Sequence, residues 1–280
     1  MEQYGLEGIR NTVIISHSGT GKTSLSEAIL FASGAISRLG RVEDGTTTSD
    51  YDPSEIRRKI SLSLSIIPCH WKGNKINFLD TPGYSDFVGE VKAGMRVAEG
   101  AVILVCAASG VEVGTEQVWE YCEETKLPRL IFVNKMDREN ADFYRTVEGL
   151  KSKFGSRCLP FQLPIGSESD FEGLVDVLTG KTYIGSESKE IPSGLQKEVN
   201  YSREKLVEAV AELDDKLLEK YLGGEELSPE ELITGLRGAV LNGKIVPVLV
   251  GSAIKNIGTG LLLDTVSSFL PSPKEQGVAI

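Results

Sequence analysis

A glycine-rich segment, Ser16-His-Ser-Gly-Thr-Gly-Lys-Thr23, follows directly after the β-branched run Thr12-Val-Ile-Ile15. Successive backbone N–H groups at the start of a helix can hold phosphate oxygens. Gly19 and Gly21 permit the backbone bend that such a loop needs. The plainer interpretation is a turn between a strand and a helix with a chance lysine, but the strand–loop–helix order favours a phosphate-binding loop.

The residue types in this segment predict how it would contact a nucleotide. Lys22 would reach the β- and γ-phosphates, and the Thr23 hydroxyl would bind Mg²⁺. Ser16 stands where the usual pattern has glycine, so the match is imperfect. The predicted nucleotide-binding residues of the loop are Ser16, His17, Ser18, Gly19, Thr20, Gly21, Lys22, Thr23 and Ser24.

Asp80-Thr-Pro-Gly83 follows a second apolar run that ends at Leu79. A carboxylate at this place would lie beside the phosphate-binding loop and could hold Mg²⁺, commonly through a water. The Gly83 N–H could approach the γ-phosphate, so loss of that phosphate could release the following loop. Alone, the motif would be interpreted as a simple turn.

Asn134-Lys-Met-Asp137 follows another apolar run and has the residue types of a guanine reader. Asp137 could accept hydrogen bonds from the N1 and N2 groups of guanine, while adenine would leave it unsatisfied at a cost of about 1–3 kcal/mol. Asn134 could contact the O6/N7 side, and the Lys135 stem could lie over the base. Gly251-Ser-Ala253 could offer an N–H to guanine O6. The predicted base-side residues are Asn134, Lys135, Asp137, Ser252, Ala253 and Ile254.

The elements that must position these motifs alternate between strand and helix. Strands are predicted at 102–105, 130–133 and 245–250, and helices at 115–125, 141–154 and 259–270. Such alternation predicts an α/β P-loop NTPase fold with a mostly parallel sheet and helices on both faces. Because each motif follows a strand, all should meet at one edge of that sheet.

Two stretches near the N-terminus have other patterns. Residues 40–59 are polar and rich in turn formers, which predicts a long mobile loop. Residues 60–66 alternate between apolar residues and serine, which predicts a strand that pairs with 75–79 through a turn at Lys72-Gly-Asn74.

The segment 167–242 departs from the alternation and is interpreted as an inserted α+β subdomain. It contains a possible strand at 181–184, an amphipathic helix at 203–221 ended by Gly223-Gly224, and a further helix through 240. Ser228-Pro-Glu-Glu231 is the capping box that begins this last helix. The predicted domains are 1–166 and 243–273 for the two parts of the nucleotide-binding domain, 167–242 for the insertion, and 274–280 for the start of a linker to a second domain.

Composition narrows the class of protein. The chain has 280 residues, 40% hydrophobic and 25% charged, as an ordinary globular protein does. Its net charge of −10 argues against a broad basic surface for nucleic acid, including sequence-specific DNA. No apolar run approaches the roughly 20 residues of a membrane span, and no secretory signal is present, so a cytoplasmic monomer is expected. The four cysteines and two histidines form no zinc motif.

Together the motifs resemble those of the translational GTPases, and in particular the GTPase domain of elongation factor G. The resemblance rests on Val42-Glu-Asp-Gly-Thr-Thr47, Asp80-Thr-Pro-Gly-Tyr-Ser-Asp-Phe87, Gly114-Thr-Glu-Gln-Val118, Val133-Asn-Lys-Met-Asp-Arg138, Gly173-Leu-Val-Asp176, Gly251-Ser-Ala-Ile-Lys-Asn256 and Leu270-Pro-Ser-Pro273. It implies GTP and GDP as ligands, Mg²⁺ as cofactor, the ribosome as partner, and hydrolysis of GTP that is slow in isolation. Translocation, ribosome recycling and ribosome rescue are all compatible with it.

Three positions depart from the family pattern and place the chain in a divergent branch. Gly19 replaces an aspartate, Ser61 replaces the threonine that binds Mg²⁺, and Tyr84 replaces the histidine that positions the attacking water. The predicted metal ligands are therefore Thr23, Ser61 and Asp80, and the predicted catalytic residues are Lys22, Gly83 and Tyr84. Because a phenol at neutral pH cannot become cationic, the alternative is a nucleotide-gated binding module with little hydrolysis. A P-loop ATPase or kinase outside translation is a third possibility.

Overall fold

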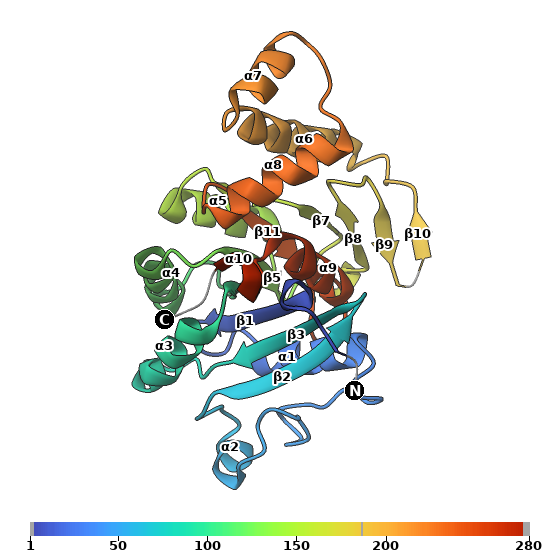
Figure 1. Cartoon of the computed structure of the whole chain (residues 1–280). Coiled ribbons are helices and arrows are strands. Elements are labelled where there is room, and N and C mark those ends of the chain that lie inside the picture. The colour runs from blue at the N-terminus through green and yellow to red at the C-terminus, as the bar shows by residue number, and fades with distance from the viewer. Residues whose placement is uncertain (1–2, 186, 277–280) are drawn as a thin grey trace.

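A seven-stranded sheet forms the centre of the molecule, in the strand order β2-β3-β1-β4-β5-β11-β6 (Figure 1). The computed structural model describes residues 3–185 and 187–276. The strands are β1 (Ile9–Ser16), β2 (Ser65–Trp71), β3 (Asn74–Asp80), β4 (Gly100–Cys106), β5 (Arg129–Asn134), β6 (Cys158–Pro160) and β11 (Val246–Val250). Every pairing is parallel except that of β2 with β3, so the predicted mostly parallel α/β sheet is confirmed.

Helices cover both faces of this sheet. Val13, Ile14 and Ile15 are consecutive in β1, point alternately to the two faces, and are all completely buried. The helix α1 (Lys22–Ala32) packs on α9 (Thr259–Phe269), and both contact β1. The helices α3 (Val88–Val97) and α4 (Val113–Thr125) also pack on β1, and α5 (Phe143–Phe154) packs on β6.

The predicted hairpin forms at one edge of the sheet, but its first strand lies further along the chain. Lys72 and Gly73 have φ values of 44° and 81°, as the two-residue turn of a right-twisted hairpin requires. The strand predicted at 60–66 is wrong for residues 60–64, because β2 begins only at Ser65. The N–H groups of 62–64 bond to carboxylates instead of a neighbouring strand.

The loop predicted at 40–59 contains a helix that the sequence interpretation missed, α2 (Pro53–Arg58). Asp52 caps it through a capping box with Glu55, and Pro53 takes the first helical position. The same signature was recognised at Ser228, where α8 (Pro229–Leu241) begins as predicted. In Figure 1, α2 projects at the end of the molecule opposite α6 and α7.

A second, antiparallel sheet lies beside the first, in the order β10-β9-β8-β7. Its strands are β7 (Gln162–Ile165), β8 (Gly173–Asp176), β9 (Thr182–Ile184) and β10 (Glu187–Lys189). β7 lies before residue 167 and the other three strands lie after it, so the sheet contains residues from both sides of the predicted boundary. The division into domains stays a prediction. Phe161 alone separates β6 from β7, and the side-chain oxygen of Gln162 accepts a hydrogen bond from the N–H of Val250 in β11.

The helix predicted over 203–221 is wrong as a single helix. α6 (Gln196–Ala211) starts earlier, and a break at 212–214 separates it from α7 (Asp215–Leu222). The break forms because the Asp214 side chain accepts hydrogen bonds from the N–H groups of Lys216 and Leu217, which caps a new helix. α7 ends before Gly223, as predicted.

Short elements complete the chain: the 3₁₀ turns η1 (Leu6–Gly8), η2 (Ser85–Phe87) and η3 (Glu168–Asp170), and α10 (Pro273–Gln276). The segment predicted as a linker, 274–280, therefore starts within α10, and residues 277–280 lie outside the described part of the chain. None of the helices within 3–185 and 187–276 combines the length and apolar character needed to cross a membrane.

Candidate nucleotide-binding site

A cleft of about 250 Å³ opens where β1 and β3 end and α1 begins. Gly21 has a φ of 98° and caps α1, so the chain turns sharply there and enters the helix at Lys22. A side chain at Gly21 would clash with Asn134, since its Cβ would lie 2.8 Å from the Asn134 Nδ2. The predicted residues that line the cleft are Ser18, Gly19, Gly21, Lys22, Thr23, Ser24, Ser61, Gly83, Tyr84 and Lys135.

Lys22 is almost completely buried at the base of this cleft, with 7% of its surface exposed. Its Nζ donates to the Ser16 Oγ at 2.9 Å, so the serine in the glycine position of the pattern gives the ammonium a partner. Burial lowers the pKa of Lys22 to about 8, although the carboxylates of Asp80 and Asp50 oppose that shift. Gly83 comes so close that a Cβ there would lie 2.4 Å from the Lys22 Nζ.

Asp80, at the end of β3, has a buried carboxylate whose oxygens accept no hydrogen bond from the described residues. Only 2% of Asp80 is exposed. The buried Ser26 and Ser49 hydroxyls lie near Asp80 and favour its ionised form, although neither makes a hydrogen bond of normal geometry. Burial raises the pKa of Asp80 to about 7, against the opposing effect of Lys22. Such orphaned oxygens fit a hydrated cation, as predicted for Mg²⁺.

The two hydroxyls predicted to bind Mg²⁺ directly lie together although 38 residues separate them. The Thr23 Oγ1 and the Ser61 Oγ are 3.0 Å apart, and the Ser61 hydroxyl donates to the Asp50 Oδ1 at 2.7 Å. Asp50 was missed by the sequence interpretation; it is buried, it lines the cleft, and burial raises its pKa. Two hydroxyls and nearby carboxylates form an all-oxygen donor set that fits Mg²⁺.

Asn134 and Lys135 brace the phosphate-binding loop from β5. The Asn134 Nδ2 donates to the carbonyl of Thr20 at 2.9 Å, and its Oδ1 accepts from the Ala253 N–H at 3.0 Å. The Lys135 Nζ donates to the Gly19 carbonyl. Loops that follow β1, β5 and β11 are thereby held at one edge of the sheet, as predicted.

The base-side residues are positioned next to these bonds. The Asp137 Oδ1 is buried and has no partner within the described chain, so it can accept from a ligand. The Ala253 N–H is already used by Asn134, which leaves the next amide, at the exposed Ile254, as the candidate donor to a base. The Ser252 hydroxyl accepts from the Lys255 N–H and so shapes the turn. Asn134 and Asp137 are not among the residues that line the cleft.

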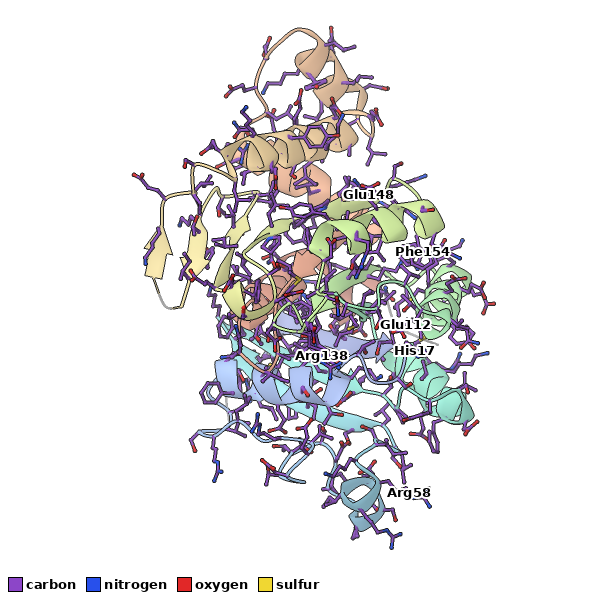
Figure 2. The ribbon with its side chains drawn as sticks, turned by 180° about the vertical axis from the view of Figure 1, so that it is seen from behind. His17, Arg58, Glu112, Arg138, Glu148 and Phe154 are labelled. Atoms are coloured by element: carbon purple, nitrogen blue, oxygen red, sulfur yellow. The ribbon has the colours of Figure 1, made fainter. Side chains whose placement is uncertain are left out.

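Of the predicted site residues His17 and Tyr84, only Tyr84 lines the nucleotide cleft. The His17 Nε2 lies 3.6 Å from the Glu112 Oε1 at the start of α4. Figure 2 shows the two residues next to each other in the view from behind. A Cβ at Gly114 would lie 2.6 Å from the His17 ring, so α4 packs directly on this residue. Tyr84 is 46% exposed and borders both the nucleotide cleft and a second hollow beside α4.

Carboxylates, two of them buried and that of Glu90 partly buried, hold residues 40–64, which we call the switch loop. Glu27 of α1 accepts from the N–H groups of Gly40 and Thr48. The Glu55 Oε1 accepts from Leu62 and Ser63 at 2.8 and 3.2 Å. Glu90 of α3 accepts from the Leu64 N–H at 2.8 Å. These residues were missed, and only Glu55 carried a sequence signal, its place in the capping box.

The strand–loop–helix geometry, the glycine-rich turn and the buried lysine define a P-loop nucleotide-binding domain. Residues 7–272 match the family model of the elongation factor Tu GTP-binding domain, and the chain belongs to this family. It is therefore a translational GTPase domain that binds GTP, which confirms the resemblance to that family. A crystal structure of a protein from Thermus thermophilus is similar over 96% of this chain and 41% of that chain, with 39% identity and a TM-score of 0.91. The chain thus spans less than half of that neighbour's length.

Proposed function

We propose that this chain binds Mg²⁺ with GTP or GDP in the cleft and hydrolyses GTP as the GTPase domain of an elongation factor G-like factor that acts on the ribosome. One observation carries the proposal: Asn134 joins the phosphate-binding loop to the loop after β11, next to the unpartnered carboxylate oxygen of Asp137. That arrangement supports a base acceptor at Asp137 beside a phosphate-binding loop at one edge of the sheet.

The residues divide the work of binding and hydrolysis. Lys22 and the N–H of Gly83 stabilise negative charge that develops on the phosphates. Thr23 and Ser61 would hold Mg²⁺ directly, and Asp80 would hold its waters. The metal ion, when bound, neutralises charge on the β- and γ-phosphates. Tyr84, which lines the cleft, would orient water through its hydroxyl.

Binding of guanosine and adenosine nucleotides, compared by calorimetry in Mg²⁺, tests the assignment of the base side. We expect GDP to bind at least about tenfold more tightly than ADP, because ADP would leave Asp137 unsatisfied. The Asp137→Ala variant should lose that preference. Equal affinity of the wild type for both nucleotides would contradict the proposal and favour an ATPase or kinase.

The second candidate is a nucleotide-gated module that hardly hydrolyses GTP, and Tyr84 favours it. A half-exposed phenol cannot supply the positive charge that a protonated imidazole can. Single-turnover GTP hydrolysis, with and without ribosomes, separates the two. Stimulation of the wild type by ribosomes supports the GTPase, whereas a large gain seen only in Tyr84→His supports the gate.

A further inference from the structure

Lys59 lines the nucleotide cleft but has no part in the contacts described above. It is the residue directly after α2, it is exposed, and it lies two positions before Ser61. The other lysines of the lining are committed: the Lys22 ammonium to Ser16, and the Lys135 ammonium to the Gly19 carbonyl. Within residues 3–185 and 187–276, the Lys59 ammonium has neither a hydrogen bond nor an ion pair.

The place of Lys59 in the chain ties it to the phosphate end of the cleft. The Ser61 hydroxyl lies 3.0 Å from the Thr23 hydroxyl, in the first turn of α1, which lines the cleft. The Glu55 carboxylate fixes the backbone on both sides, at Asp52 and at Leu62. The cation is therefore carried by an ordered turn and not by a free end.

The lining of the cleft has few free charges, so a bound triphosphate could still be neutralised by a further cationic side chain. Its acidic members are Glu43 and Asp50, and Asp50 is already engaged by the Ser61 hydroxyl. A bound triphosphate would add several negative charges to this space. The neighbours of Lys59 in the helix, Arg57 and Arg58, are exposed but do not line the cleft, and Figure 2 shows Arg58 on α2 at the end of the molecule.

We propose that Lys59 contacts the terminal phosphate of a bound triphosphate and so raises the affinity of the chain for the triphosphate over the diphosphate. This inference rests on the guanine nucleotide binding proposed above. Lysine binds phosphate as a point charge without a fixed geometry, which suits an exposed side chain on a loop. GDP lacks that phosphate, so Lys59 should discriminate between the two nucleotides.

The plainer role of Lys59 is that of a helix cap. Its φ of 56° is the left-handed conformation that ends many helices, and a cation there complements the helix dipole. Lys126 provides the matched control, because it ends α4 with a φ of 53°, is exposed, and lies away from the cleft.

The test is the affinity for GDP and for a non-hydrolysable GTP analogue in Mg²⁺, measured on the 280-residue chain. We expect Lys59→Gln to weaken the analogue by about fivefold to tenfold and GDP by less than about twofold, as for one exposed charge-assisted contact. Lys59→Arg should keep the wild-type ratio of the two affinities, and Lys126→Gln should change neither. The loss in Lys59→Gln should shrink in high salt, because exposed charges are screened.

Lys59→Gly separates the contact from the cap, because glycine accepts the left-handed backbone but carries no charge. If Lys59 contacts phosphate, this variant loses discrimination as Lys59→Gln does. An unchanged affinity ratio in both variants would overturn the inference while leaving guanine nucleotide binding intact. If the wild type bound neither guanine nucleotide, the proposed function would fail first, and this inference with it.

Discussion

Two regions at the nucleotide cleft and beside it, which we call the fixed wall and the switch wall, are held by different chemistry. The fixed wall comprises residues 16–24, 134–137 and 251–254. Its loops are joined through backbone groups, by the Asn134 amide between the Thr20 carbonyl and the Ala253 N–H and by the Lys135 ammonium on the Gly19 carbonyl. The switch wall is the switch loop, whose backbone N–H groups bond to the carboxylates of Glu27, Glu55 and Glu90.

The difference indicates how one cleft can both bind and respond. Amide-to-carbonyl bonds do not depend on the charge state of the ligand, so the fixed wall can grip GDP and GTP alike. Glu27, Glu55 and Glu90 do not line the cleft, but they hold the loop that carries Asp50 and Ser61 to it, and carboxylate contacts are sensitive to added negative charge and to a metal ion. The switch wall is therefore the part expected to move when the terminal phosphate leaves.

The largest effect is expected from a break in the fixed wall. Asn134→Ala removes bonds to two loops at once and leaves a buried carbonyl and N–H unpaired, at a cost of about 2 kcal/mol or more. We expect GDP and GTP affinities to fall together by about 100-fold. Asn77→Ala, which loses one bond to the Asn11 side chain away from the cleft, is the control. A selective loss of GTP binding would contradict the comparison.

Asp80 should make the stability of the nucleotide-free protein depend on pH. Its pKa is raised to about 7 in the folded state, so between about pH 4 and pH 7 the folded protein binds more protons than the unfolded chain. Stability should therefore decrease as pH rises through this window, by on the order of 4 kcal/mol, and level off above it.

Urea unfolding in EDTA across pH 5 to 8 measures this dependence. Asp80→Asn should flatten the profile, and added Mg²⁺ with GDP should restore stability at the high end, because a cation stabilises the ionised form. The same slope in wild type and variant would show that Asp80 does not titrate there.

A substitution that weakens the switch wall should leave the affinity for GDP unchanged. Glu55→Gln weakens three bonds, to Asp52, Leu62 and Ser63, and we expect GTP hydrolysis to fall about tenfold with GDP affinity unchanged. Trypsin should also cleave faster after Arg57, which is exposed on α2. Glu231→Gln disrupts the corresponding capping box of α8 outside the cleft and should affect neither measurement.

The smallest effect is expected at Glu90, which makes a single bond from α3 to the Leu64 N–H. Glu90→Gln should slow GTP hydrolysis by about twofold to threefold, because one bond of this kind contributes little. Glu99→Gln is the control, since Glu99 also accepts one backbone N–H, from Asn11, away from the cleft. An effect as large as that of Glu55→Gln would mean that α3 carries the switch loop.

The sequence predicted the fixed wall well and the switch wall poorly, for a physical reason. Residues of the fixed wall bind through the backbone and through local motifs, so their types and spacing are constrained along the chain. The switch wall depends on carboxylates that meet N–H groups up to 26 residues away, and no local spacing records such partners. The serine alternation at 60–66 imitated a strand because the N–H groups of 62–64 found partners outside any sheet.

Phe161, the single residue between β6 and β7, limits how far the nucleotide-binding domain can be shortened. Phe161 is 3% exposed, packs edge-on against Phe269, accepts a backbone bond from Val177, and donates its own to Val248. Deletion of 167–242 would remove the Val177 N–H that bonds to the Phe161 carbonyl. It would also remove β8, the partner of β7, and expose Leu163. The smaller sheet therefore packs against the nucleotide-binding domain as part of the same core. Its removal would expose that core beside the loop 251–254, which follows β11.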